Sequence, residues 1–316
     1  MKKVLIVIDR IELKYYEFKN LVTNFWFNKI LLEMGCEVDI CTIDNLSIMN
    51  FQPYANCFNT QWKNNNLIKS EKQILKNIND FDPILFRPDP PVDIDYINST
   101  LIFDFIDENR VKIINNPKSI RNFNEKFHSD LFPQYVPENI ISADKNIISD
   151  FVKKHKKTVI KPLNQCFGQG VMALFDDDLN KNTIIKTATN NYKTICLVQK
   201  YLNGATKGDK RVLTLGEEVL EYSVTKAPLK NDFKFSEHSD NYLKPAKLTK
   251  QEKILAQTVA KKLNQLEIPM AGLDLLDGKI LEINVTSTCY FIKEIKNLYD
   301  IYLSDKFKNF FSAYLN

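Results

Sequence analysis

The residues best suited to chemistry lie near the end of the chain, in the segment 272–284. Asp274 comes before an Asp-Gly pair, a strong signal for a tight β-hairpin turn, and Glu282 and Asn284 come after it. Glu282 and Asn284 are two residues apart, so they share one face of a strand. Two carboxylates and an amide oxygen that face the same way suit a hard cation such as Mg²⁺. We therefore interpret Asp274, Glu282 and Asn284 as metal ligands.

The turn decides whether this interpretation is possible. A regular two-residue turn at Asp277 and Gly278 would pair Asp274 with Leu281. Because directly opposed residues share a face, Asp274 would then point away from Glu282. A metal site therefore requires a loop with an odd number of residues, or a β-bulge that corrects the register. The alternative is a solvent-facing acidic strand edge, and the apolar residues between the polar ones favour a site modestly.

The elements that must position this hairpin begin with an alternating pattern. Apolar runs predict strands at 4–9, 37–42, 83–86 and 111–114, separated by helical patterns at 17–34 and 94–108. This βαβ alternation predicts a small, mostly parallel sheet. Turn residues at 115–119 end the unit.

The rest of the chain is predicted to be α+β. An inserted lid is expected to contain strands at 158–161, 171–175 and 195–200 and helices at 147–154 and 182–189. After it we expect strands at 211–215, 219–224, 271–275 and 279–284, with helices at 251–266 and 304–314.

Composition limits the classes of partner. The net charge is only +4, so nothing favours a nucleic acid or a membrane surface as a partner. The N-terminal apolar run has five residues, fewer than the roughly 7–15 of a signal peptide. The six cysteines form no C-x-x-C pair, and the three histidines stand apart from them, so zinc is not indicated. We predict free thiols and a cytoplasmic protein.

Several motifs together resemble those of bacterial glutathione synthetases, which have the ATP-grasp fold. The segment 281–287 (L-E-I-N-V-T-S) resembles their E-I-N-V-T-S element. Five more segments resemble family motifs in the same order: 86–91 (F-R-P-D-P-P), 116–126 (N-P-K-S-I-R-N-F-N-E-K), 160–163 (I-K-P-L), 208–212 (G-D-K-R-V) and 272–274 (G-L-D). The resemblance implies an α/β ATP-grasp fold with an N-terminal pre-ATP-grasp (Rossmann-like βαβ) domain at 1–120, an α+β lid at 121–202 and a C-terminal ATP-grasp domain at 203–316.

The resemblance also implies that ATP and Mg²⁺ bind, with Mn²⁺ as the alternative ion. It assigns the phosphates to Lys126 and Lys161 and to the glycine-rich segment of Gly168 and Gly170. It assigns adenine to a hinge and the ribose to one carboxylate: Gln199, Lys200, Tyr201, Leu202 and Asp209. From the residues alone, either lysine could be an ordinary surface lysine and the hinge an ordinary buried strand.

Proteins of this family phosphorylate a carboxylate with ATP and let an amine displace the phosphate, which forms a peptide bond. The resemblance implies that Arg211 and Lys226 are catalytic, with Arg211 stabilising an acyl phosphate or holding a substrate carboxylate. It places Arg87, Thr286 and Ser287 in the peptide pocket. From the residues alone, Arg87 and Arg211 could equally form surface salt bridges.

The chain departs from the family at the phosphate lid. The family pattern P-L-D-G-x-G-G-x-G-V becomes P-L-N-Q-C-F-G-Q-G-V at 162–171, so Gln165 and Phe167 stand where glycine is usual. Glycine lets the backbone approach phosphate closely, so we expect this lid to bind phosphate differently.

A second loop, at 226–241, whose counterpart in the family covers the active site, departs further. Lys226 and Lys234 stand for arginines, which alone can form a two-pronged contact to phosphate or carboxylate. Other replacements in this part of the chain are Ser236 for asparagine, Asp240-Asn241 for a glycine pair, and a changed segment at 288–291.

Three hypotheses follow. The leading one is a glutathione synthetase that joins γ-glutamylcysteine to glycine. The second is a related ATP-dependent ligase with a different peptide or amino-acid substrate. The third is a nucleotide-binding homologue with little catalysis. The partners are small molecules in each case, and the resemblance implies a homo-oligomer, a tetramer.

Overall fold

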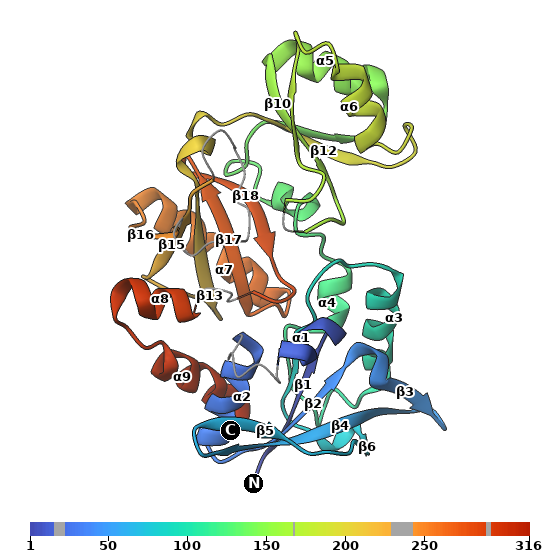
Figure 1. Cartoon of the computed structure of the whole chain (residues 1–316), viewed down its shortest axis with the longest axis vertical. Coiled ribbons are helices and arrows are strands. Elements are labelled where there is room, and N and C mark those ends of the chain that lie inside the picture. The colour runs from blue at the N-terminus through green and yellow to red at the C-terminus, as the bar shows by residue number, and fades with distance from the viewer. Residues whose placement is uncertain (16–22, 167, 229–242, 289–291) are drawn as a thin grey trace.

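The computed structural model of the chain describes residues 1–15, 23–166, 168–228, 243–288 and 292–316. Three β-sheets with their helices are arranged along the long axis of the molecule (Figure 1). The eight-stranded sheet of the N-terminal residues lies at one end and a four-stranded sheet at the other. The six-stranded sheet of the last third of the chain lies between them. Along the sequence, the sheets at the two ends of the molecule therefore come before the sheet in the middle.

The parallel part of the first sheet confirms the predicted alternation. Its strands lie in the order β2 (Glu37–Thr42), β1 (Lys3–Ile8), β7 (Ile84–Phe86) and β8 (Ile113–Ile114). The five apolar residues of β1 from Val4 to Ile8 all have zero exposure, as expected for a strand covered on both faces. The helices that follow β1 and β7 are α1 (Arg10–Tyr15), α2 (Thr23–Glu33) and α3 (Ile94–Ile102).

The prediction of a mostly parallel sheet is wrong, because four of the eight strands pair antiparallel. They are β3 (Leu46–Met49), β4 (Gln52–Lys63), β5 (Asn66–Lys69) and β6 (Ile74–Asn77). The turn between β4 and β5 uses Asn64 and Asn65 in the left-handed conformation, with φ of 51° and 59°. Asparagine is frequent throughout the sequence, so this turn signal did not stand out.

One predicted helix is shorter than expected, and part of another lies outside the described residues. That part is 17–22 of the helix predicted at 17–34, whose described residues form α2 from Thr23 to Glu33. The helix predicted at 94–108 ends at Ile102 and continues as the short 3₁₀ turn η4 (Phe103–Phe105).

The lid is an antiparallel sheet with two helices on one face. Its strand order is β11 (Met172–Phe175), β10 (Lys157–Pro162), β12 (Cys196–Lys200) and β9 (Asn139–Ser142). Helices α5 (Lys145–His155) and α6 (Lys181–Ala188) cover the face that carries Ile160, Leu174 and Val198. Because side chains alternate along a strand, Val159, Lys161 and Gln199 lie on the opposite face.

The central sheet carries the predicted hairpin. Its main strands lie in the order β16 (Leu243–Ala246), β15 (Ser223–Lys226), β13 (Asp209–Leu215), β17 (Met270–Leu276) and β18 (Lys279–Asn284), and β14 (Glu218–Val219) pairs with β13. The strand predicted at 219–224 is therefore two strands, β14 and β15. Helix α7 (Lys250–Gln265) begins with a capping box of Thr249 and Glu252. Leu255, Val259 and Leu263 of α7 pack on Leu273 and Leu275, which leaves the other face of β17 for the site.

The end of the chain packs on its beginning. After α8 (Ile292–Tyr299), helix α9 (Ser304–Leu315) lies beside α2 (Figure 1). The ring of Phe27 is 4.9 Å from that of Phe307 and 5.5 Å from that of Phe311, centroid to centroid. All three rings have 0% exposure. One apolar cluster therefore joins the N-terminal sheet to the last helix.

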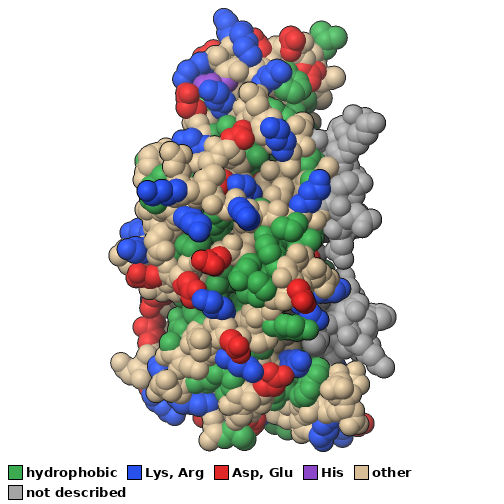
Figure 2. Space-filling model, turned by 90° about the vertical axis from the view of Figure 1, so that its left-hand side faces the viewer, with side chains coloured by type: hydrophobic (Ala, Val, Ile, Leu, Met, Phe, Trp, Pro, Cys, Tyr) green, Lys and Arg blue, Asp and Glu red, His purple; other side chains and the backbone are tan. Residues whose placement is uncertain are grey.

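The surface agrees with the low net charge. Basic and acidic side chains are interspersed over the face shown in Figure 2. That face therefore lacks the single-sign patch that attracts nucleic acid. Among the described residues, no helix combines the length and apolar character that crossing a membrane requires.

Replacing Phe27 with alanine tests this joint. We expect Phe27→Ala to lower the free energy of unfolding by about 3–5 kcal/mol, because it leaves a cavity between α2 and α9. Phe51→Ala is the control, since Phe51 is 84% exposed, and should change stability by no more than about 0.5 kcal/mol. Urea denaturation measures both, and equal effects would contradict the proposed joint.

Candidate functional site

The hairpin of β17 and β18 has a two-residue turn and a compensating bulge. Asp277 and Gly278 form the turn with φ of 49° and 70°, between the paired Leu276 and Lys279. The register then shifts, so that Asp274 lies directly opposite Glu282. The shift leaves Leu281 as the extra residue of the bulge. Of the two possibilities derived from the sequence, an odd-length loop or a β-bulge, the structure has the β-bulge.

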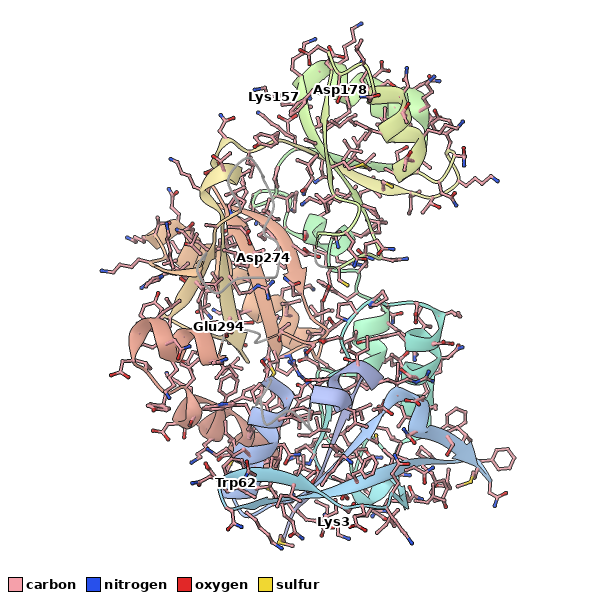
Figure 3. All side chains as sticks on the ribbon, in the orientation of Figure 1. Lys3, Trp62, Lys157, Asp178, Asp274 and Glu294 are labelled. Atoms are coloured by element: carbon pink, nitrogen blue, oxygen red, sulfur yellow. The ribbon has the colours of Figure 1, made fainter. Side chains whose placement is uncertain are left out.

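A cavity of about 270 Å³ lies where the three sheets meet. Asp274, Glu282 and Asn284 all line it, as do Arg211 and Lys226. Figure 3 shows Asp274 on the central sheet, between the lid and the N-terminal sheet. The structure thus brings the predicted metal ligands and the predicted catalytic residues into one cavity.

Asp274 is the most heavily paired carboxylate of the cavity. Arg211 holds it with two bonds, from Nε to Oδ1 at 2.6 Å and from Nη2 to Oδ2 at 3.0 Å. Lys226 Nζ lies 2.9 Å from Oδ2. Burial alone would raise the pKa of Asp274, but Arg211 and Lys226 outweigh it and hold that pKa well below its usual range. Asp274 is therefore a carboxylate anion at any physiological pH.

Lys226 links Asp274 to the predicted ribose ligand. Its Nζ lies 2.7 Å from Oδ2 of Asp209, which also lines the cavity. The backbones of β13 and β15 meet closely here: a Cβ on Gly208 would lie 2.3 Å from the carbonyl oxygen of Lys226. Gly208 has φ of 92°, so a glycine is required at this point on both counts.

The two predicted phosphate lysines differ in their partners. Lys126 Nζ lies 2.9 Å from Oε1 of Glu282 and donates to the carbonyl oxygen of Gln165 at 2.6 Å. Burial opposes the charge of Lys126, but Glu282 outweighs it and raises the pKa of the ammonium. Burial lowers the pKa of Lys161 to about 8. Within the described part of the chain, Lys161 forms no ion pair, so its charge is available to an anion.

The predicted hinge forms an apolar end of the cavity. Gln199, Lys200, Tyr201 and Leu202 line it together with further apolar side chains from the lid and the central sheet: Val159, Val171, Leu276 and Leu281. Gln199 is only 2% exposed, and its Nε2 has no hydrogen-bond partner among the described residues. A buried amide without a partner is costly, so this end of the cavity suits a flat polar ring with acceptor atoms.

The turn between β17 and β18 also binds the segment that follows the predicted hinge. Oδ2 of Asp277 accepts a hydrogen bond from the backbone N–H of Gly204 at 2.9 Å. Gly204 lies in the 3₁₀ segment η6 (Asn203–Lys207), which directly follows the hinge. One hairpin therefore contacts both the predicted adenine end and the predicted metal end of the cavity.

The glycine-rich segment at 162–171 only partly lines the cavity. Gly168 lines it, whereas Gly170 does not. Both have positive φ, 69° and 68°, and a Cβ on Gly170 would lie 2.8 Å from Cγ of Pro162. Several of the departures from the family lie outside the described residues: Phe167, Lys234, Ser236, Asp240, Asn241 and the segment 289–291.

Thr286 and Ser287 line the cavity at its other end, and Arg87 does not. Arg87 has 0% exposure, and its guanidinium binds protein groups. Nη2 donates to the carbonyl oxygen of Thr288 at 2.9 Å, and Nε donates to Oδ1 of Asn24 at 3.0 Å. Among the described residues, Arg87 therefore forms no surface salt bridge, and its predicted place in the lining of the peptide pocket is also wrong.

Sequence analysis missed several residues of the cavity, among them Asp89, Glu125 and Cys166. Asp89 and Glu125 stand inside two of the quoted motifs, so the signal was present but unused. Leu281 was missed because it belongs to the bulge. Cys166 stands in the altered lid, where its Sγ lies 3.8 Å from the carbonyl oxygen of Pro90.

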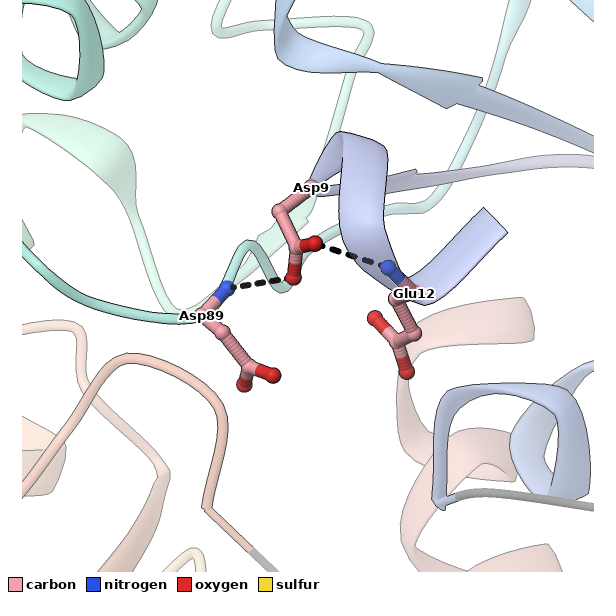
Figure 4. A group of neighbouring side chains, drawn as sticks. All are labelled: Asp9, Glu12 and Asp89. Carbon is pink, nitrogen blue, oxygen red and sulfur yellow. Dashed lines mark hydrogen bonds between the residues drawn. The ribbon is translucent and has the colours of Figure 1, made fainter. Parts of the chain in front are cut away.

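Asp89 also belongs to an acidic group with Asp9 and Glu12 (Figure 4). Oδ1 of Asp9 accepts from the N–H of Glu12 at 2.8 Å, and its Oδ2 accepts from the N–H of Asp89 at 3.3 Å. Glu12 accepts from Nδ2 of Asn24 at 2.8 Å. Asp9 thus begins α1 and fastens the loop after β7, so this group already has a structural role.

The chain matches two family models over nearly its whole length. Residues 3–121 match "Prokaryotic glutathione synthetase, N-terminal domain", and residues 125–300 match "Prokaryotic glutathione synthetase, ATP-grasp domain". Solved structures that resemble it at low identity show the fold. A D-cycloserine synthetase has a TM-score of 0.68 at 10% identity, covering 99% of this chain and 100% of that one. D-alanyl-alanine synthetase A from Vibrio cholerae has a TM-score of 0.60 at 13% identity, covering 99% and 98%.

Curated relatives agree with the family models. The glutathione synthetase of Vibrio cholerae is 33% identical over 239 residues, which is 75% of this chain and 74% of that protein. The glutathione synthetase of Buchnera aphidicola is 33% identical over 261 residues, or 80% and 79%. With the ATP-grasp fold and a cavity at its centre, the chain belongs to the prokaryotic glutathione synthetase family.

Proposed function

We propose that this protein is an ATP-dependent ligase that joins the cysteinyl carboxylate of γ-glutamylcysteine to the amine of glycine. The γ-phosphoryl group of ATP passes to the carboxylate, which gives an acyl phosphate and ADP. The amine nitrogen then attacks the carbonyl carbon, phosphate leaves with the C–O bonding electrons, and the nitrogen loses a proton. The observation that carries the proposal is the bulge at Leu281, which turns Asp274 and Glu282 towards the same cavity as four cationic side chains: Lys126, Lys161, Arg211 and Lys226.

The donor set fits a magnesium ion. Nδ2 of Asn284 donates to the carbonyl oxygen of Gly272 at 3.2 Å, which leaves the amide oxygen as the atom for a cation. Asp274 and Glu282 supply anionic oxygens. Bound Mg²⁺, with Mn²⁺ as the alternative ion, would neutralise charge on the transferring phosphoryl group. A fold neighbour, an ATP-grasp ligase with a TM-score of 0.65 and 12% identity, was solved with Mg and ADP.

The metal is expected to bind together with the nucleotide. Asp274 and Glu282 each already have a cation within 3.0 Å. The ligands alone therefore offer little net negative charge to a divalent ion, and the triphosphate supplies the rest. Phosphate oxygens would in turn attract Lys126 and Lys161.

The chain's own residues divide the remaining work. Gln199 to Leu202 hold adenine and Asp209 holds the ribose. Arg211, anchored on Asp274, and Lys226 stabilise the acyl phosphate or hold a substrate carboxylate. Arg87 acts on the peptide pocket indirectly, through the backbone of Thr288, which it binds. Thr286 and Ser287 contact the peptide directly.

The setting of the reaction rests on the family resemblance and the composition. We propose a cytoplasmic homo-oligomer, a tetramer, whose partners are small molecules. The free state of the described cysteines supports a reducing compartment.

The assay for this function is direct. Purified protein with Mg-ATP, γ-glutamylcysteine and glycine should release ADP and phosphate in equal amounts, and EDTA should stop the release. ADP release with other dipeptides or amines, and none with this pair, would select a related ligase instead. ATP binding without turnover on any carboxylate would select the non-catalytic homologue.

Removing Lys226 tests the catalytic assignment. We expect Lys226→Ala to lower kcat/KM by about 100-fold or more, because a cation that stabilises developing charge is lost. Lys244→Ala is the control, since Lys244 is exposed on the adjacent strand β16, and should leave kcat/KM unchanged. Similar values for the two variants would remove Lys226 from the mechanism.

The low pKa of Lys161 predicts proton uptake when nucleotide binds. With a pKa of about 8, about half of the free protein has an uncharged Lys161 at that pH. Phosphate oxygens favour the charged form, so Mg-ADP binding should take up roughly half a proton at pH about 8 and almost none at pH about 6.5. Isothermal titration calorimetry in buffers of different ionisation enthalpy measures this uptake.

Two variants identify the group that takes up the proton. Arginine stays charged, so Lys161→Arg should abolish the uptake. Lys157→Arg, at an exposed position on the same strand, should retain it. Undiminished uptake in Lys161→Arg would assign the proton to another group.

A further inference from the structure

The segment Val285 to Thr288, which we call the substrate loop, follows directly from the metal strand β18. It has no regular secondary structure, yet Thr286 and Thr288 are only 3% and 1% exposed. Buried backbone groups need hydrogen-bond partners. Since no helix or strand supplies them here, side chains from other parts of the chain must fix the shape of the loop.

Glu125 binds one side of the substrate loop. Its Oε1 accepts three hydrogen bonds: from the N–H of Val285 at 2.7 Å, from the N–H of Thr286 at 3.1 Å and from Oγ1 of Thr286 at 3.1 Å. Burial and Glu282 raise the pKa of Glu125, and the hydrogen bonds from the N–H groups of Val285 and Thr286 oppose that rise. A single carboxylate oxygen therefore fixes two backbone donors and one side chain.

Two other buried residues bind the carbonyl oxygens of the loop. Nδ2 of Asn115 donates to the carbonyl oxygen of Val285 at 2.8 Å, and Arg87 donates to that of Thr288 at 2.9 Å. Both side chains have 0% exposure, and neither lines the cavity. Among the three anchors of the loop, Glu125 alone faces the cavity.

The bond from Thr286 to Glu125 has a chemical consequence. A threonine hydroxyl has one proton, and Thr286 gives it to Glu125. The oxygen of Thr286 can then only accept a hydrogen bond from a molecule in the cavity. Asp89 and Glu125 line the same cavity, and their carboxylates also accept rather than donate. This end of the cavity thus offers acceptors.

We propose that Glu125 is a specificity-determining positioning residue, which orients Thr286 so that the substrate loop binds an ammonium group of the substrate rather than a carboxylate. The inference rests on the proposed ligase function. Two ammonium groups are possible: the one on the γ-glutamyl part of the dipeptide and the one on the amino acid that becomes the nucleophile. Carboxylates of the substrates are left to Arg211 and Lys226, at the metal end of the cavity.

Kinetics of Thr286→Val distinguish the two ammonium groups. Loss of the acceptor should raise KM about tenfold for the dipeptide or for glycine, whichever ammonium binds the loop, and leave KM for Mg-ATP within about twofold. Thr258→Val is the control, because that hydroxyl of α7 also donates a hydrogen bond, to the carbonyl oxygen of Ile254 at 2.9 Å, but does not line the cavity. Unchanged KM for both amine substrates would overturn the proposal.

Glu125 variants separate positioning from general damage. A glutamine side chain at this position would keep an oxygen that can accept from the loop, so Glu125→Gln should retain most of the affinity that Glu125→Ala loses. If the substrate loop binds the ammonium group of the dipeptide, the wild-type protein with Mg-ADP should bind γ-glutamylcysteine more tightly than glutarylcysteine, the analogue without that group. Equilibrium binding measures this preference. Glu125→Ala should lose that preference, and if it does not, Glu125 sets no specificity.

A readout without substrate keeps the inference separate from the ligase proposal. Hydrogen exchange at the amides of Val285 and Thr286 should accelerate at least about tenfold in Glu125→Ala, because their acceptor is gone, and should stay slow in Glu125→Gln. Unchanged exchange in Glu125→Ala would refute the anchoring itself. Loss of protection in that variant, with a wild-type protein that forms no peptide, would instead leave the anchoring intact and reject the reaction.

Discussion

A shift of one residue between β17 and β18 determines which side chains of this hairpin face the cavity. Without it, Asp274 and Glu282 would lie on opposite faces of the central sheet, and one carboxylate would face the apolar residues of α7. An unpaired carboxylate there would cost several kcal/mol or lose its charge. The bulge lets Ile280 and Ile283 stay in the core while Leu281, Glu282 and Asn284 face the cavity. The same extra residue thus adds an apolar side chain to the cavity and brings Glu282, a proposed metal ligand, to that side of the sheet.

The bulge also shows how much of this hairpin could be predicted from the sequence. The segment 279–284 places its core residues three apart, at Ile280 and Ile283, where a regular strand would place them two apart. That spacing is the trace of a bulge, but Leu281 between them is apolar too and hides it. The sequence therefore showed that the register of the hairpin must be corrected if Asp274 and Glu282 are to share a face. It did not show whether a longer loop or a bulge makes that correction.

Elsewhere the limits follow from where the determining contacts lie. Strands such as β1 were predictable because their apolar residues are consecutive and buried on both faces. Among the antiparallel strands, β3, β5 and β6 have no buried residue, and the buried residues of β4 are Pro53, Ala55, Cys57 and Thr60, so no strong apolar alternation marks these strands. The position of Arg87 depends on partners about 200 residues later in the chain. No local pattern records that contact, although the motif around Arg87 was noticed.

The buried charge of Arg87 explains why the N-terminal sheet belongs to the site. An arginine with no exposure needs compensation, and its hydrogen bonds to Asn24 and Thr288 are to neutral oxygens. Asn24 in turn donates to the carboxyl group of Glu12. Burial and Asp89 raise the pKa of Glu12 well above its usual value, and Asn24 and Arg87 oppose only part of that rise. The acidic group at the start of α1 is therefore connected to the substrate loop through Asn24 and Arg87. Cζ of Arg87 also lies 5.4 Å from the ring centroid of Phe27, which packs against the last helix. The N-terminal sheet thus contributes to the site by keeping the substrate loop in one shape.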